Sequence, residues 1–334
     1  MAYLTGFLFF LGTIYWLVHV SLPGMLIVVA YLALYFGFFG LIMNITQYSI
    51  RNTQYERLFL IPAIWVALEW ARSYVFTGFG WALLGYSQSY NLPVIQIADI
   101  SGAYGVSFLI VMFNAAAFYA IKNFRNKKEF IFPMVIAAVI ITVASGYGLL
   151  RLNNIFTGER LKVCVVQGNI PQDRKWDAQF AQSIIEKYSK LTILSTKEKP
   201  DLIIWPETSV PGFIEDEGKL LKWVSGLAVM TDSPLLVGAP RYEVVSGREL
   251  YYNSAFLFLK DGSLDRHYDK MHLVPFGEYV PLKDLFFFVH RFASRPIGDF
   301  VGGKEFTVLR FPVVRSVKEK DHSWKLMKLS LIHI

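Results

Sequence analysis

The first half of the chain consists of long apolar runs separated by short polar stretches. Several runs approach the roughly 20 residues that an α-helix needs to cross the hydrocarbon core of a bilayer. The pattern therefore predicts a polytopic α-helical membrane domain over residues 1–152, with about five spanning helices. The predicted spans cover residues 3–20, 24–43, 57–76, 104–121 and 130–149.

The first run could be mistaken for a secretory signal peptide. It lacks a basic flank and a clear cleavage site of small residues, and further apolar runs follow it. Cleaved signals normally carry both features. We therefore expect the run at 3–20 to be a retained helix.

Beyond residue 160 the apolar runs become shorter and alternate with stretches of helical length. Short apolar runs bounded by turn residues are typical of strands. Alternating strands and helices predict a layered α/β domain over residues 160–312, followed by an atypical tail at 313–334. The predicted strands are 161–169, 202–207, 234–240 and 254–260, and the predicted helices are 177–196 and one near 217–230.

Composition supports a membrane protein. Hydrophobic residues make up 54% of the chain and aromatic residues 16%, and the mean hydropathy of +0.39 is high for a soluble protein. The formal net charge of +7 is modest, and no nucleic-acid-binding signature is present, so we expect no nucleic-acid partner. Up to residue 121 the charged residues are Arg51, Glu56, Arg57, Glu69, Arg72 and Asp99.

The basic residues predict the orientation in the membrane. The loop 122–128 is strongly basic, and Arg51 and Arg57 fall on the same side one pair of spans earlier. Because cytoplasmic loops carry an excess of Lys and Arg, this side should be cytoplasmic. The segment 77–103 has no basic residue and should lie outside. The predicted span 130–149 starts from the cytoplasmic loop 122–128 and therefore ends on the outer face, which places the α/β domain there.

Two features of the membrane half leave alternatives open. The segment 77–103, rich in glycine and aromatic residues, is either an interfacial aromatic belt or a re-entrant element that lines a path for lipid. Glu69 and Arg72 are three residues apart and face the same side of a helix. They can pair, reach the interface, or mark a substrate path, and we expect them to pair.

Charged residues at turns are the candidates for chemistry. Glu207 follows the apolar strand Leu202–Pro206, and strand ends of α/β sheets often carry catalytic groups. Lys270 and Glu278 flank a turn that Pro275 and Gly277 favour. Such a turn can hold opposite charges close together in a poorly hydrated place. A surface loop with an incidental ion pair is the alternative.

Cys164 is the only cysteine, so the chain cannot form an intrachain disulfide. It lies in an apolar strand pattern, where cysteine usually behaves as a small buried hydrophobe. A reactive thiol is the alternative. No Cys/His spacing typical of a metal site occurs, and we expect neither a metal nor a cofactor.

Three ordered motifs carry a resemblance to a known family. They are Val166-Gln-Gly-Asn-Ile-Pro-Gln172 with Lys175-Trp176, Trp205-Pro-Glu-Thr208, and the stretch from Tyr268 to Pro281. Together with Thr77-Gly-Phe-Gly-Trp81 and Tyr86-Ser-Gln88, they resemble the bacterial apolipoprotein N-acyltransferases. The resemblance implies a multi-pass protein of the bacterial cytoplasmic membrane with a nitrilase-like αββα sandwich domain.

The resemblance also implies a reaction. An acyl chain passes from a phospholipid, typically phosphatidylethanolamine, to an enzyme cysteine, and then to the α-amine of the N-terminal cysteine of a diacylated apolipoprotein. By analogy Glu207 is the general base and Lys270 stabilises the oxyanion. Glu278 orients Lys270 or assists proton transfer. Trp176 contacts substrate or serves packing.

The chain departs from the family pattern at the nucleophile. In the family, the cysteine follows the lysine at a strand-to-helix elbow. Residues 306–312 resemble the strand that leads into this elbow, but no cysteine occurs after them. Ser316 and Ser323 lie in no recognisable elbow. We therefore expect a C-terminally incomplete chain that is inactive. It is either a truncated or frame-shifted product, or a divergent protein that kept the scaffold and lost the chemistry. A non-catalytic lipid- or lipoprotein-binding protein and an amidase of the nitrilase superfamily are the rival functions.

Overall fold

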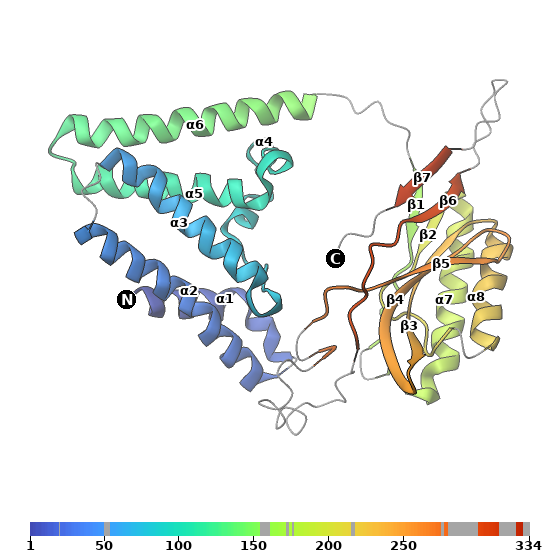
Figure 1. The fold of residues 1–334 in the computed structure, drawn as a ribbon. Coiled ribbons are helices and arrows are strands. Elements are labelled where there is room, and N and C mark those ends of the chain that lie inside the picture. The colour runs from blue at the N-terminus through green and yellow to red at the C-terminus, as the bar shows by residue number, and fades with distance from the viewer. Residues whose placement is uncertain are drawn as a thin grey trace. The chain divides into compact units, whose positions relative to one another are not determined.

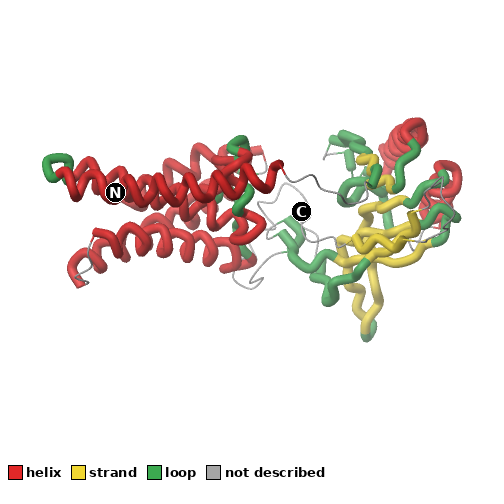
Figure 2. Tube along the Cα trace, turned by 90° about the horizontal axis from the view of Figure 1, so that it is seen from above, coloured by secondary structure: helices red, strands yellow, loops and turns green. Residues whose placement is uncertain are grey.

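A computed structural model gives the fold in two compact units, Met1–Thr157 and Gly158–Ile334. Figure 2 shows that the first is built of helices, whereas the second combines strands with helices. The structure describes residues 1–19, 21–49, 54–153, 161–171, 174–175, 177–214, 218–274, 277–279, 300–313 and 325–329.

Helices of the first unit occupy all the apolar runs that predict spans (Figure 1). Among the described residues, three stretches are long and apolar enough to cross a membrane by length and composition: Leu22–Thr46, Ala98–Lys122 and Ile131–Asn153. The number of helices that cross stays a prediction, because α1 is shorter and α3 carries four charged residues. The elements are α1 (Ala2–Thr13), η1 (Tyr15–His19), α2 (Leu22–Ser49), α3 (Gln54–Tyr74), η2 (Val75–Thr77), η3 (Leu84–Gln88), α4 (Leu92–Ile95), α5 (Ala98–Lys122) and α6 (Lys127–Asn153).

Two apolar clusters hold this unit together. One joins α1 to α2 through Phe10, Ile14 and Leu32. The other joins α3, α5 and α6 and includes several alanines, which allow helix backbones to approach closely. Gly148 of α6 serves the same purpose at α4, since a Cβ there would lie 1.8 Å from the carbonyl oxygen of Pro93.

The expected ion pair between Glu69 and Arg72 is not formed in the described part of the chain. Arg72 instead donates to the carbonyl oxygens of Phe79 at 3.2 Å, Trp81 at 2.7 Å and Ala82 at 3.4 Å. Glu69 Oε1 accepts from the backbone N–H of Leu84 at 2.9 Å. The two side chains, 4% and 3% exposed, therefore both fasten the irregular segment between α3 and η3.

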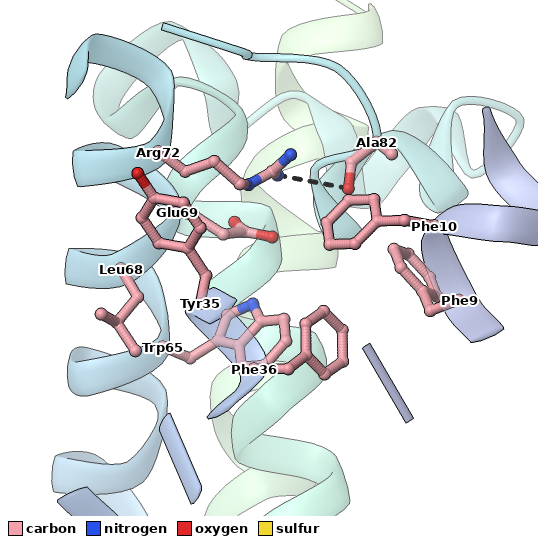
Figure 3. Close-up of a pocket in the computed structure, with 9 residues that line it drawn as sticks. All are labelled: Phe9, Phe10, Tyr35, Phe36, Trp65, Leu68, Glu69, Arg72 and Ala82. Atoms are coloured by element: carbon pink, nitrogen blue, oxygen red, sulfur yellow. Dashed lines mark hydrogen bonds between the residues drawn. The ribbon is translucent and has the colours of Figure 1, made fainter. Parts of the chain in front are cut away.

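Figure 3 shows that these two charged groups lie at a pocket with an aromatic lining. The guanidinium carbon of Arg72 lies 5.3 Å from the ring centroid of Phe10, a cation–π distance. Irregular backbone is tolerated at membrane depth only where protein groups satisfy its polar atoms. Arg72 and Glu69 supply those groups here. The remaining lining residues are Phe9, Tyr35, Phe36, Trp65, Leu68 and Ala82.

Replacing Arg72 should therefore destabilise the first unit. In Arg72→Met, three carbonyl groups lose their donor and the buried Glu69 carboxylate loses its charge interaction with Arg72, at a cost of about 3 kcal/mol or more. Thermal unfolding of the detergent-solubilised chain measures the effect. Arg151→Met, which removes an exposed pair with Asp99, should cost at most about 1 kcal/mol. Equal losses in the two variants would contradict the proposed fastening.

The second unit is built on a mixed five-stranded sheet (Figure 1) with the order β1-β2-β3-β4-β5. β1, β2 and β3 are parallel, whereas β3–β4 and β4–β5 are antiparallel. A separate antiparallel pair joins β6 and β7. The strands are β1 (Val163–Val165), β2 (Leu202–Ile204), β3 (Leu235–Val245), β4 (Arg248–Phe258), β5 (Leu264–Asp269), β6 (Leu309–Val313) and β7 (Lys325–Leu329), and the helical elements are η4 (Ala178–Phe180), α7 (Ala181–Ser195), η5 (Thr196–Glu198) and α8 (Gly218–Thr231).

Both faces of this sheet are apolar and covered. Ile203, Val237 and Phe256 belong to the core cluster that contains the buried faces of α7 and α8. Their strand neighbours point to the other face and pack with Leu309 and Phe311 of β6. Burial on both faces explains the near-continuous apolar runs of β2 and β3. Helices cover one face and β6 covers the other, which agrees with the predicted layered α/β sandwich.

The observed strands differ in length from the predicted ones. β1 is shorter than the predicted 161–169, whereas β3 and β4 form a long hairpin around Ser246-Gly247. Both turn residues have positive φ, 52° and 76°, the backbone that two-residue hairpin turns of type I′ need. The hairpin extends beyond the core into exposed residues, so its outer part gives no buried-strand signal in the sequence.

Candidate active site

Glu207 lies where the chain leaves the end of β2. Just before it, Trp205 is 2% exposed and its ring packs between those of Tyr188 and Trp223, at centroid distances of 4.9 and 5.3 Å. Just after it, the backbone N–H of Ser209 donates to the carbonyl oxygen of Gly238 at 2.8 Å. The carboxylate is therefore held between two fixed points of the sheet and its core.

Gly238 of β3 allows this turn to lie against the sheet. A Cβ at residue 238 would lie 2.4 Å from the carbonyl oxygen of Pro206 and 2.7 Å from the Cα of Glu207. Any side chain there would displace the turn that carries the carboxylate. The glycine is required for close backbone approach rather than for a special φ.

Lys270 follows the end of β5 and lies between two carboxylates. Its Nζ is 2.9 Å from Glu207 Oε1, 3.1 Å from Glu278 Oε1 and 3.0 Å from Glu278 Oε2. Its backbone is held on both sides, since its N–H donates to the carbonyl of Asn253 at 2.8 Å and its carbonyl accepts from Gly303 at 3.0 Å. The structure thus brings together the three charged residues that the sequence singles out.

Glu278 closes the turn that begins at Val274. Its backbone N–H donates to the Val274 carbonyl at 2.9 Å, and its Oε2 accepts from the Val274 backbone N–H at 2.7 Å. Its side chain is 12% exposed, compared with 19% for Lys270 and 56% for Glu207. Glu207 is therefore the accessible carboxylate and Glu278 the enclosed one. Pro275, expected in this turn, lies outside the described residues.

Asn253 of β4 is a site residue that the sequence analysis missed. Its side-chain amide donates to Glu207 Oε1 and, at 2.6 Å, to Glu278 Oε1. The residue is 5% exposed. An Asn followed by a Ser within the apolar and aromatic stretch Leu250–Phe258 is the signal that could have pointed to it, since buried polar groups need partners.

Lys175 adds a second positive charge beside Glu207. Its Nζ donates to the Glu207 backbone carbonyl at 2.9 Å. Burial lowers the pKa of Lys175 although the nearby Glu207 charge opposes the shift. Trp176, the candidate substrate contact next to it, lies outside the described residues.

Electrostatics keeps the central pair charged near neutral pH. Burial would raise the pKa of Glu207, but the hydrogen bond and charge of Lys270, helped by Asn253 and Lys175, hold that pKa below its ordinary value. Burial would lower the pKa of Lys270, but its hydrogen bonds and charge interactions with Glu207 and Glu278 raise it. The site thus offers a carboxylate that can accept a proton and an ammonium that can stabilise an oxyanion.

Cys164 packs in the sheet core. It pairs with Ile203 in the register of β1 and β2, and its half-buried side chain lies against the cluster beneath α7 and α8. This placement agrees with the expectation of a small packed hydrophobe.

Comparison with known proteins identifies both parts of the chain. Residues 1–116 match the apolipoprotein N-acyltransferase N-terminal domain, and residues 162–318 match the carbon-nitrogen hydrolase family. An apolipoprotein N-acyltransferase of Geobacter metallireducens is 36% identical over 321 residues. The chain is similar to the apolipoprotein N-acyltransferases along most of its length.

The chain spans 61% of the length of that relative, and the alignment covers 92% of the chain. The apolipoprotein N-acyltransferase of Nitrosomonas europaea is 33% identical, over 90% of the chain and 61% of the relative. Among solved structures, an N-terminal amidase with a Gln-Gly peptide aligns over 51% of this chain and 38% of its own, at 18% identity and a TM-score of 0.35. That likeness is too low to support any inference about chemistry.

The pKa shifts of Glu207 and Lys270 predict the pH dependence of the protein's stability. The pKa of Glu207 is lower in the folded state than in the unfolded state. Its contribution to the free energy of unfolding is therefore complete above the unfolded pKa of about 4.3 and is lost as the pH falls through the folded pKa. Because the Lys270 pKa is raised, its contribution is complete below about 10.4 and is lost as the pH rises through the folded value.

Glu207→Gln should therefore lower stability by a constant amount between about pH 5 and pH 9, and the difference should vanish in stronger acid. Thermal unfolding of both chains across that range measures it. Glu198→Gln, which removes an exposed pair with Lys162, should change stability little at any pH. A Glu207 difference that grows as the pH falls would contradict the lowered pKa.

Gly238→Ala should displace the Glu207 turn. The added Cβ leaves too little space against rigid backbone, which typically costs about 1–3 kcal/mol. Gly226→Ala in α8 meets no atom within 4 Å and should be neutral or slightly stabilising. Thermal unfolding gives the cost. A Gly238→Ala chain as stable as its parent would show that the turn does not need the glycine.

Proposed function

We propose that this chain carries the acyl-transfer site of an apolipoprotein N-acyltransferase. The donor is a phospholipid, with phosphatidylethanolamine as the expected one, and the acceptor is the α-amine of the N-terminal cysteine of a diacylated apolipoprotein. The observation that supports the proposal most is the ammonium of Lys270 between the carboxylates of Glu207 and Glu278, in a chain similar to this family.

Glu207 moves the protons in the proposed reaction. In the first step it takes the proton of the family's cysteine thiol, and the thiolate attacks the phospholipid ester carbonyl. When the C–O bond breaks, the departing glycerol oxygen takes that proton and a thioester remains. In the second step the lipoprotein amine attacks the thioester, Glu207 takes an amine proton, and the C–S bond breaks as the amide forms. The thiolate then recovers the proton.

Lys270 stabilises the oxyanion in both steps. Each attack turns a neutral carbonyl into a tetrahedral oxyanion, and a fixed ammonium beside it lowers the barrier because little reorganisation is needed. Glu278 supports this role by holding Lys270 with both of its oxygens. Trp176 stays a candidate substrate contact.

The nucleophile is the part of the proposal that these 334 residues do not supply. Their single cysteine, Cys164, packs in the sheet core. We infer that the chain as written does not form the acyl thioester, since losing a nucleophile leaves only binding and electrostatic effects. A non-catalytic lipid- or lipoprotein-binding protein is the second candidate, supported by the same observation.

We further propose that the protein lies in the bacterial cytoplasmic membrane with the α/β domain on the outer face. The apolar helices support the membrane location. The basic loop at 122–128 supports the orientation through the excess of positive charge on cytoplasmic loops. Both substrates are lipid-anchored, so a membrane-bound site would receive them laterally.

A chimaera tests the proposed chemistry. Residues 313–334 are replaced by the part of the Geobacter metallireducens relative that follows the segment aligned with β6, where the resemblance implies the family's cysteine. The chimaera should transfer a labelled acyl chain from phosphatidylethanolamine to a diacylated lipopeptide. Glu207→Gln or Lys270→Ala in the chimaera should lower the rate by about 100-fold or more.

The controls separate the rival functions. Lys260→Ala, at an exposed pair with Asp232, should leave the chimaera active, and the unmodified chain should bind lipopeptide without turnover. A folded chimaera that binds both lipids but transfers nothing would support the non-catalytic candidate. Turnover by the unmodified chain that survives Cys164→Ala would refute the need for a thiol.

A further inference from the structure

Asn253 contacts Glu207, Lys270 and Glu278, the three central charged residues of the candidate site. Its backbone carbonyl accepts the N–H of Lys270 at 2.8 Å. Its side-chain Nδ2 donates to Glu207 Oε1 and, at 2.6 Å, to Glu278 Oε1. One residue of β4 thus fixes groups from three separate segments.

The amide and the ammonium converge on the same two oxygens. Lys270 Nζ also lies 2.9 Å from Glu207 Oε1 and 3.1 Å from Glu278 Oε1. The second oxygen of Glu278 is occupied as well, by the Val274 backbone N–H at 2.7 Å and by Lys270 at 3.0 Å. Each oxygen of Glu278 therefore faces a neutral donor and the ammonium.

Glu207 is different, because only one of its oxygens is occupied. Within the described residues, Oε1 accepts both hydrogen bonds and Oε2 accepts none, and the side chain is 56% exposed. A carboxylate oxygen with two donors is a poorer proton acceptor than one with none. Oε2 of Glu207 is thus the carboxylate oxygen of this site that is free to take a proton.

Position 253 requires an uncharged side chain that can donate two hydrogen bonds, one to Glu207 and one to Glu278. An amide turned the other way would place its carbonyl oxygen against two carboxylate oxygens, which fixes the orientation. An aspartate would add a third negative charge, and a serine hydroxyl has one hydrogen to donate. Asparagine satisfies both carboxylates without changing the charge of the site.

We propose that Asn253 is a positioning residue that, with Lys270, occupies Oε1 of Glu207 and Oε1 of Glu278 and so leaves Glu207 Oε2 as the proton acceptor. Glu278 then orients Lys270 and takes no proton itself. The inference deepens the proposed function and uses its assignment of Glu207 as the base. It concerns the protonation of one carboxyl group, which can be measured without turnover.

The test is the pH dependence of carbodiimide labelling of Glu207 in the full chain in detergent. Carbodiimides react with protonated carboxyl groups, and peptide mass spectrometry follows Glu207 separately from the other carboxyls. In Asn253→Leu, which keeps the size but removes the donor, the labelling midpoint should rise by about one pH unit, because a hydrogen bond to the charged form is lost. In Asn253→Asp it should rise at least as far.

Ser254→Ala is the matched control. Ser254 is the next residue of β4, is equally buried and donates to Asp269 Oδ1 at 2.6 Å, so the variant loses one buried hydrogen bond on the same strand. Its Glu207 midpoint should not move. A merely structural role for Asn253 would lower thermal stability in both kinds of variant without moving the midpoint.

Either of two results would overturn the proposal. One is that the folded Asn253→Leu and Asn253→Asp chains have the same Glu207 labelling midpoint as the parent chain, or that Ser254→Ala shifts this midpoint by as much as they do. The other is loss of the folded state in both Asn253 variants, which would make the residue a structural one. A failed acyl-transfer assay with a shifted midpoint would count against the proposed function and leave the role of Asn253 standing.

Discussion

The second unit is organised around one ammonium group held between two carboxylates. Lys270 and Glu278 are largely removed from water, which is costly, and close hydrogen bonds must offset the cost. The distances of 2.9 to 3.1 Å from Lys270 to Glu207 and Glu278 meet that condition. Loss of Lys270 would leave two carboxylates without their shared cation, so the arrangement constrains all the segments that carry the three groups.

The sheet meets this constraint by bringing strand ends together. Glu207 follows β2 and Lys270 follows β5, although 63 residues separate them along the chain. Gly238 lets the Glu207 turn lie against β3, and Asn253 ties β4 to both carboxylates. Each charged group sits on a short turn at the rim, while apolar side chains on both faces of the sheet keep the strands in register. Core packing thereby sets distances between polar atoms.

The sequence predicts the charged groups better than their partners. A carboxylate after an apolar strand and a lysine before a Pro-Gly turn are local signals, so Glu207, Lys270 and Glu278 could be found. Asn253 is harder to find, because its contact with Glu207 spans 46 residues, and the Asn-Ser pair within β4 is the one local hint of it. The spacing of Glu69 and Arg72 also led to a wrong prediction. Two residues three apart on a helix are expected to pair, but both side chains instead form hydrogen bonds with backbone groups that follow α3.

The two units use different cations for different tasks. Arg72 presents a rigid planar fork of donors and binds three carbonyl oxygens of one segment, which suits a permanent structural bond. Lys270 presents a compact charge with rotatable donors, shared among carboxylate oxygens of two residues. An ammonium of this kind can turn part of its hydrogen bonding toward a new oxyanion without leaving its place. A guanidinium fixed by three carbonyls would have to break those hydrogen bonds to do so, so a lysine suits the proposed oxyanion-stabilising role better.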